Sequence, residues 1–134
     1  MNYWLVKTEP ETYSWDNLVK EKTGVWDGVR NFQARSNMKT MKKGDQVFIY
    51  HTGEEKAIIG TAKVVKEGYP DPKDAEWVAV DLAPERKLKS SVTLAQVKAD
   101  KKLADMVLVR ASRLSVQPVK ESEFEYIVAM SQKG

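Results

Sequence analysis

GDQVFIYHTGEEKAIIGTAKVVKE, residues 44–67, gives the clearest indication of the fold. Residues 46–51 and 57–67 are both rich in β-branched and aromatic side chains, and the polar residues 53–56 separate them. Two such runs joined by a short turn predict a β-hairpin.

Three further segments have the composition of strands. They are residues 3–8, which precede Pro10, residues 77–82, and residues 106–116. Between the second hairpin strand and residue 77, Pro70-Asp71-Pro72 predicts a loop, because proline has no N–H to donate and restricts the residue before it.

Helices are predicted on both sides of these strands. Ser14 with Asn17, and Thr93 with Gln96, have the spacing of a capping box. The predicted helices run from residue 14 to about 24, from 31 to about 41, from 93 to 98 and from 121 to 130, with a further turn at 103–106. Residues 25–30 are predicted to form a loop that carries Trp26.

Short strands joined by hairpins, with helices between some of them, predict an α+β fold. We expect a mixed sheet of five to six strands that curls toward a barrel, rather than a doubly wound parallel sheet. A chain of 134 residues buries roughly two-thirds of its unfolded surface. No repeat or linker divides it, so residues 1–134 are expected to form one domain.

The inventory of reactive side chains is small. There is no cysteine, and His51 is the single histidine, so thiolate and multi-histidine metal sites are excluded and no metal or cofactor is expected. The N-terminal residues lack the apolar core of a secretory signal, and no apolar stretch approaches the roughly 20 residues of a membrane span. We therefore expect no membrane partner and a cytoplasmic protein, or a nuclear one in a eukaryote.

The net charge of +3 is small, but its distribution is uneven. One acid-free interval between Asp27 and Asp45 holds Arg30, Arg35, Lys39, Lys42 and Lys43, and another between Asp105 and Glu121 holds Arg110, Arg113 and Lys120. The two intervals predict basic segments that face one partner, against the alternative that they are ordinary solvated faces.

Most catalytic signatures are absent. The sequence has no zinc-deaminase motif, no Gly-x-Ser-x-Gly elbow and no P-loop or dinucleotide fingerprint. What remains is a metal-free acid/base pair of His51 with Glu9, Lys7 or Arg113, of the kind a small ribonuclease uses. A structural, hydrogen-bonded His51 is the alternative.

Trp26 is the aromatic residue that best fits a binding site. It lies between Gly24 and Gly28 and is followed by Arg30 and Asn31, so an indole face stands beside a cation and an amide. That combination suits a planar heteroaromatic ligand with a phosphate. The alternative is that Trp26 covers the core, as Trp4 and Trp77 are expected to do from their strands, while Trp15 fastens the first helix to the sheet.

The chain resembles the EVE domain family from Tyr3 to Ile127. The resemblance is carried by YWLVKTEP (3–10), YSW (13–15), WDGVRNFQAR (26–35), GDQVFIYH (44–51), YPDP (69–72), WVAVD (77–81) and SRLSVQP (112–118). It implies a PUA-like fold akin to YTH and ASCH domains. It also implies a non-catalytic domain that binds nucleic acid, DNA or RNA, and holds a modified base flipped out of its strand.

By the same resemblance, four segments surround the base. The implied ligand-binding residues are Lys7, Thr8, Glu9, Trp26, Val29, Arg30, Asn31, Ala34, Arg35, Tyr50, His51, Thr52, Ser112, Arg113, Leu114, Ser115, Val116, Gln117 and Pro118. Thr8 stands where the family more often has serine, which adds a methyl group, and Lys120 stands where a helix-capping residue is common. Two alternatives stay open: a small metal-free RNA-processing enzyme of the ASCH type that uses His51, and a module that binds a small molecule or a protein.

Overall fold

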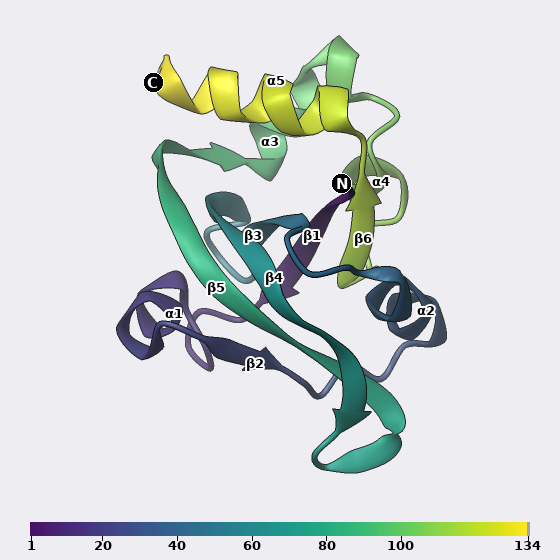
Figure 1. Cartoon of the computed structure of the whole chain (residues 1–134). Helices are drawn as coiled ribbons and strands as arrows, with labels where there is room; N and C mark the ends of the chain where they lie inside the picture. The colour runs from purple at the N-terminus through teal and green to yellow at the C-terminus, as the bar shows by residue number, and fades with distance from the viewer. Residues whose placement is uncertain (134) are drawn as a thin grey trace.

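A computed structural model describes residues 1–133, which form one mixed sheet with helices around it (Figure 1). The sheet order is β2-β5-β4-β3-β1-β6; β1 and β3 are parallel, and the other neighbours are antiparallel. The strands are β1 (Tyr3–Thr8), β2 (Gly24–Trp26), β3 (Gln46–His51), β4 (Ala57–Asp71), β5 (Asp74–Thr93) and β6 (Val116–Val119). The helices are α1 (Trp15–Glu21), α2 (Phe32–Thr40), α3 (Leu94–Ala99), α4 (Val107–Arg110) and α5 (Glu121–Gln132), with a short 3₁₀ turn at Lys101–Leu103.

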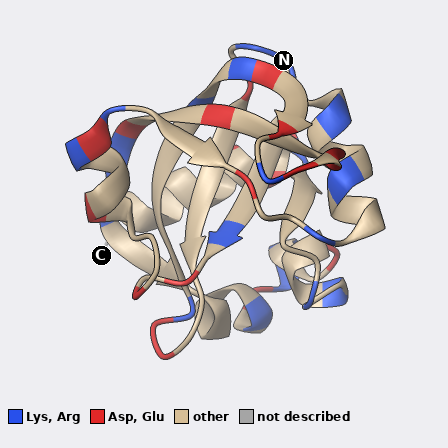
Figure 2. Ribbon diagram, turned by 90° about the horizontal axis from the view of Figure 1, so that it is seen from below, with Lys and Arg blue, Asp and Glu red and all other residues tan. Residues whose placement is uncertain are grey.

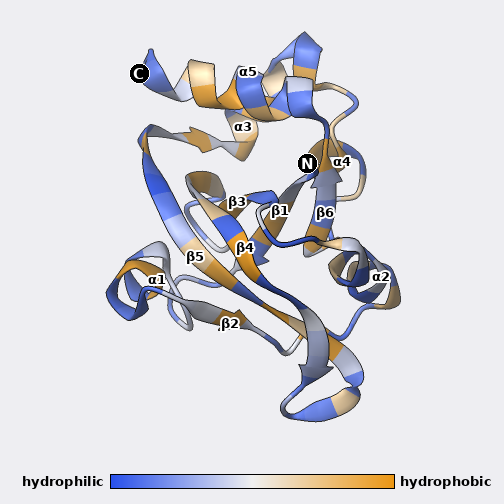
Figure 3. Ribbon diagram, viewed as in Figure 1, coloured by the Kyte–Doolittle hydropathy of each residue, from blue (hydrophilic) through white to orange (hydrophobic). Residues whose placement is uncertain are grey.

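Both faces of the sheet are covered by helices. Because side chains alternate between the two faces along a strand, the strands contribute to two separate apolar clusters. Val47 and Ile49 of β3 belong to one apolar cluster with residues of α1 and α2, whereas Phe48 and Tyr50 belong to a second with residues of α3, α4 and α5. Phe48 stacks on a ring of the terminal helix, Phe124, with centroids 4.1 Å apart. Figure 3 accordingly shows the apolar residues concentrated in β1, β3 and the middle of β5.

The sheet curls until its two edges approach each other. Strands β2 and β6 lie at opposite ends of the strand order, yet Trp26 of β2 and Val116 of β6 share one apolar cluster. Helix α2 contacts β6, where Asn37 Nδ2 donates to the Val116 carbonyl at 2.7 Å. The α+β class and the curled mixed sheet are confirmed; by its hydrogen bonds the sheet is open.

Local signals placed several elements correctly. Ser14 caps α1 and Thr93 caps α3, each in a capping box, and Asn31 caps α2 by accepting the Ala34 N–H at 2.9 Å. The hairpin at 46–67 and the terminal helix are also confirmed. Trp15 fastens α1 to the sheet as expected: its ring lies 2.6 Å from where a Cβ on Gly60 of β4 would be.

Three predictions about elements are wrong. Residues 24–26 of the expected helix end and loop form β2, which pairs with β5 at Val80 to Leu82. Strand β4 continues through Pro70 to Asp71, so only Pro72 of the expected loop lies in the turn, and β5 extends beyond the expected residues 77–82 and through Pro84. Register shifts next to both prolines remove the demand for their missing N–H. Residues 106–115 form α4 and the turns after it, and only Val116 of the expected strand lies in a strand, β6. Met106 and Leu108 reach the second cluster from a helix too short to show periodicity.

Candidate functional site

A cavity of about 540 Å³ opens where the two sheet edges approach. It lies between the end of β1, the residues after it, the segment from β2 toward α2, and the residue before β6. Its lining is Lys7, Thr8, Glu9, Thr12, Tyr13, Val25, Trp26, Asp27, Gly28, Val29, Arg30 and Ser115. This volume is in the usual range for a pocket that holds a small molecule or an equivalent group.

Two aromatic side chains form the apolar part of the lining. Trp26 is 7% exposed and belongs to the core, so it both covers the core and borders the cavity. Tyr13 meets it edge to face, with centroids 5.6 Å apart and planes at 83°. The Tyr13 hydroxyl donates to Glu21 Oε1 at 2.7 Å, and burial together with this carboxylate raises its pKa. The ring is thus fixed as a neutral phenol.

Gly24 makes the approach of Tyr13 possible. A Cβ at position 24 would lie 2.5 Å from the Tyr13 hydroxyl oxygen and 2.8 Å from Leu18 Cδ1. Glycine at this position therefore sets the distance between the start of β2 and the aromatic wall.

The end of β1 contributes two polar side chains, Lys7 and Thr8, which already donate hydrogen bonds within the protein. Lys7 Nζ donates to the Ser112 carbonyl and lies 5.6 Å from the centroid of Tyr50, and burial lowers the lysine pKa. The Thr8 hydroxyl donates to the Tyr13 carbonyl at 2.6 Å. Lys7 is therefore the cation of this wall, and Thr8 mainly fixes the Tyr13 segment.

The charged rim at Arg30 is held by a residue outside the lining, Asp71. The buried Asp71 carboxylate accepts the Gly28 N–H at 2.8 Å, the Lys73 N–H at 2.7 Å and Arg30 Nη1 at 3.0 Å. Burial raises the Asp71 pKa, but these donors and the Arg30 charge outweigh it and lower the pKa to about 2. Gly28 adopts φ +74, which glycine accepts without strain, so its N–H can meet Asp71.

The structure brings part of the expected site together. Of the nineteen sequence-predicted residues, those that line the cavity are Lys7, Thr8, Glu9, Trp26, Val29, Arg30 and Ser115. A second hollow of about 360 Å³ is lined by Asn31, Ser112, Arg113 and Leu114 with Gln33 and Ala111. A third, of about 190 Å³, includes Tyr50 and Thr52 with Lys7 and Ser112. Lys7 and Ser112 are each shared between hollows, so the three are neighbours.

Other expected residues lie elsewhere. Ala34 of α2 and Val116 and Gln117 of β6 are buried in the interior of the protein. The Gln117 amide donates to the Leu114 carbonyl. Pro118 of β6 pairs with Trp4 of β1, and Arg35 lies against Phe32 and Trp77 outside the cavity. None of these five side chains lines this cavity.

His51 also lies away from the cavity, in a hollow with Trp15, Glu55 and residues of β5. Its Nε2 accepts the Trp15 N–H at 3.0 Å, and its Nδ1 lies 2.7 Å from Glu55 Oε1. His51 therefore ties the start of α1 to the hairpin. Neither of these ring-nitrogen contacts involves Glu9, Lys7 or Arg113.

Sequence reasoning missed six residues of the site. Thr12, Tyr13, Val25, Asp27 and Gly28 line the cavity, and Asp71 holds its rim. The stretches YSW and YPDP marked Tyr13 and Asp71, but no periodicity shows that these residues meet the segment after β2.

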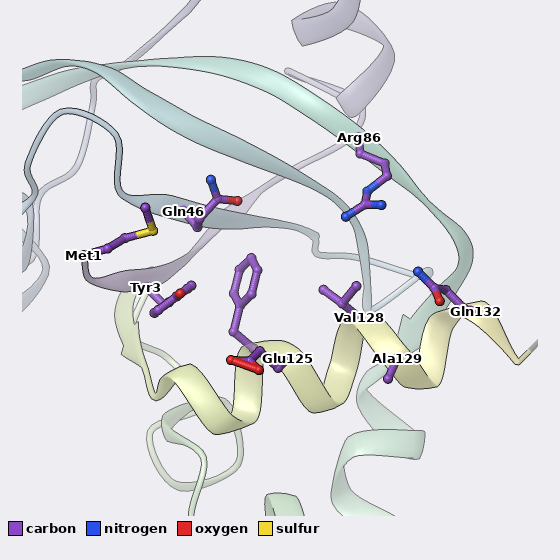
Figure 4. A pocket seen from close by; sticks show the side chains of 9 residues that line it. Met1, Tyr3, Gln46, Arg86, Glu125, Val128, Ala129 and Gln132 are labelled. Carbon is purple, nitrogen blue, oxygen red and sulfur yellow. The ribbon is translucent and has the colours of Figure 1, made fainter.

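The rest of the described surface has no other feature that fits the expected site. Figure 2 shows Lys and Arg interleaved with Asp and Glu over several elements, rather than gathered in one band. A groove of about 500 Å³ lies between α5 and the sheet (Figure 4) and contains none of the expected site residues. Its lining combines apolar and aromatic side chains with Gln46, Arg86, Glu125 and Gln132. Within residues 1–133 no cluster of metal-ligating side chains is present, and none of the described helices has the length and apolar character to cross a membrane.

Known proteins resemble this chain over nearly its full length. The NMR structure of Rpa0253 from Rhodopseudomonas palustris is 46% identical, with a TM-score of 0.94, and the match covers 99% of this chain and 94% of that one. Human thymocyte nuclear protein 1 is 33% identical over 98% of this chain and 75% of its own length. A crystal structure of human THYN1 protein in complex with 5-methylcytosine-containing DNA is 32% identical, with a TM-score of 0.93, covering 100% and 99% of the two chains.

More remote similarity concerns the fold alone. ASCH from Zymomonas mobilis is 12% identical with a TM-score of 0.61, which fits the expected PUA-like fold. The sequence model of the EVE domain, by contrast, matches residues 2–130. The chain belongs to the EVE domain family.

Proposed function

We propose that residues 1–134 act as one domain that binds nucleic acid and holds a modified base in the cavity beside Trp26. The observation that carries this proposal is a cavity walled by two fixed aromatic rings, with Lys7 and Arg30 at its edge. The human THYN1 structure with 5-methylcytosine-containing DNA supports it, and makes 5-methylcytosine the first base to test.

The cavity has the groups that a flipped-out base requires. Extruding a base costs a few kcal/mol from a duplex and less from a single strand. One aromatic stack returns about 1–3 kcal/mol, so it only offsets extrusion. The remaining affinity must come from polar contacts to the base edge and the phosphates, for which Lys7 and Arg30 are placed.

Arg30 is suited to a phosphate. Its bonds to Asp71 and to the Val29 carbonyl both use Nη1, and no other bond of its guanidinium is found within residues 1–133. Because the Asp71 carboxylate fixes the side chain in advance, less side-chain entropy is lost when a phosphate binds.

The proposal includes no catalytic step. Both ring nitrogens of His51 have hydrogen-bond partners away from the cavity, which supports a structural role for this residue. A cytoplasmic protein, or a nuclear one in a eukaryote, remains part of the proposal.

Binding to paired oligonucleotides tests it. Two single-stranded DNAs that differ only in one 5-methyl group are titrated by fluorescence anisotropy. A methyl group in an apolar pocket is worth about 1–3 kcal/mol, so the methylated DNA should bind roughly fivefold to a hundredfold tighter.

Trp26→Leu should remove this preference, because it keeps an apolar side chain but loses the stacking surface. Trp15→Leu is the matched control, since Trp15 is 4% exposed and equally part of the core but lies outside the cavity. Circular dichroism confirms that both variants fold. The proposal is rejected if the wild-type protein binds DNA with 5-methylcytosine no more tightly than DNA with cytosine, and likewise shows no preference for any other modified base in a panel.

A further inference from the structure

A second aromatic surface lies outside the cavity. Phe32, in the first turn of α2, is 68% exposed. Its ring stacks on Trp77 of β5, with centroids 5.3 Å apart and planes at 28°. A single exposed apolar side chain needs no explanation, but an exposed ring already stacked on a second ring forms a flat, rigid surface.

Two guanidinium groups accompany these rings. Arg35 Cζ lies 4.9 Å from the centroid of Phe32 and 5.0 Å from that of Trp77, and Arg30 Cζ lies 5.5 Å from Trp77. We call Phe32, Trp77, Arg30 and Arg35 the Phe32 surface. Cations against aromatic faces beside an exposed ring are the composition of sites that stack bases and track a phosphate backbone.

The geometry of the Phe32 surface is fixed without neutralising Arg35. Arg35 Nη1 donates to the backbone carbonyl of Glu76 at 2.9 Å, not to its carboxylate. Within residues 1–133, the ion pairs found include Arg30 with Asp71 but none of Arg35. The arginine is held in place by a neutral group and keeps its charge for an anion.

Arg30 joins the Phe32 surface to the cavity. It lines the cavity and, through the same guanidinium, lies over Trp77. The Phe32 surface therefore begins at the edge of the cavity.

We propose that the Phe32 surface is a second nucleotide subsite, which takes the base adjacent to the one in the cavity. That base stacks on Phe32, and its phosphate lies near Arg30 and Arg35. This inference rests on the proposed function and adds a contact that does not depend on base modification. The subsite supplies affinity, and the cavity supplies selectivity.

A thermodynamic cycle between Phe32 and the adjacent base tests the subsite. Single-stranded DNAs carry a central cytosine or 5-methylcytosine, and either normal neighbours or an abasic residue on one side or the other. Phe32→Ala is compared with the wild-type protein and with Val19→Ala, an exposed apolar residue of α1 that is 48% exposed and lines none of the cavities described above.

One aromatic stack on a base predicts a loss of about fivefold to a hundredfold for Phe32→Ala on DNA with normal neighbours. On DNA with the abasic residue on the contacted side, the variant and the wild-type protein should bind equally. The ratio of affinities for 5-methylcytosine and cytosine should not change, and Val19→Ala should behave as the wild type.

The outcomes separate the two proposals. The subsite is wrong if Phe32→Ala has no effect. It is also wrong if Phe32→Ala and the abasic residue weaken binding independently, so that their effects multiply, whichever side of the central base the abasic residue is on. If the losses coincide but the wild-type protein does not prefer any modified base, the subsite stands and the function proposed for the cavity fails. If Phe32→Ala instead abolishes a dimer seen by sedimentation, the Phe32 surface is a protein interface and the subsite is likewise wrong.

Discussion

The carboxylate of Asp71 holds the guanidinium of Arg30 at 3.0 Å, although the two residues are 41 positions apart in the chain. Asp71 ends β4, and Arg30 precedes α2. Together with the bond from the Gly28 N–H, this pair fixes the segment that follows Trp26 against the β4–β5 hairpin. The rim of the cavity therefore depends on a buried charge outside it.

Asp71→Asn should lower both stability and nucleic-acid affinity. The side chain loses its charge while three donors remain directed at it, which costs about 1–3 kcal/mol of unfolding free energy. Urea denaturation measures the loss. Asp105→Asn is the control, because its exposed pair with Arg110 contributes little. Equal stability of the two variants would contradict a supporting role for Asp71.

The pH dependence of unfolding gives a second test of the contribution of Asp71 to stability. The Asp71 pKa is lowered from 3.8 to about 2 in the folded protein, so its contribution is complete above pH 4 and is lost as the pH falls from about 4 to about 2. This contribution amounts to about 2 kcal/mol. Asp71→Asn should have a flatter stability profile in that window, and an unchanged profile would argue against the depressed pKa.

His51→Ala should affect stability and leave binding unchanged. The variant removes the acceptor for the Trp15 N–H, and an unmade buried hydrogen bond costs about 1–3 kcal/mol. Thermal denaturation measures this, with Glu55→Gln as the control that keeps an acceptor for the imidazole Nδ1–H. A His51→Ala protein of normal stability that no longer binds nucleic acid would return this residue to the functional site.

Gly24→Ala should reduce selectivity for a modified base. The new Cβ would lie 2.5 Å from the Tyr13 hydroxyl and displace this ring from Trp26. Overpacking of this kind also costs about 1–3 kcal/mol of stability. The double variant with Tyr13→Phe should recover part of both losses, although the contact with Leu18 remains. If the double variant recovers neither selectivity nor stability, the contact of the new Cβ with Tyr13 is not the cause of the losses.

Arg35→Gln should weaken binding to all sequences by a similar factor. Because the guanidinium is expected to neutralise one phosphate, the slope of log affinity against log salt should become smaller by about one. Titrations of wild type and variant at several salt concentrations measure both effects. A change in modified-base preference with an unchanged slope would contradict a phosphate contact.

Much of the fold was accessible from local sequence signals. Ser14 and Thr93 marked helix starts because their capping boxes are short-range patterns. The extent of β5 was not accessible, since Pro84 breaks the strand pattern and only the register shift opposite it makes the strand possible. The helix at residues 107–110 was missed because four residues give no helical period.

The candidate site was predictable by segment more than by side chain. The KTE segment, Trp26 and Arg30 were found, because the motifs that contain them lie at strand ends that meet. His51 lies in a different hollow from Tyr50, because neighbouring strand residues point to opposite faces of the sheet. Arg35 lies one residue from the buried Ala34, on a different side of α2.

The most direct measurement follows the four tryptophan indole N–H resonances by NMR during titration with 5-methylcytosine-containing single-stranded DNA. The Trp26 resonance, assigned from its absence in Trp26→Leu, should shift strongly, and that of Trp77 should shift as well. Trp4, whose indole N–H is bound to Asp45 at 2.9 Å, and the buried Trp15 should change little. A Trp26 resonance that stays in place at saturating DNA would show that the base binds elsewhere.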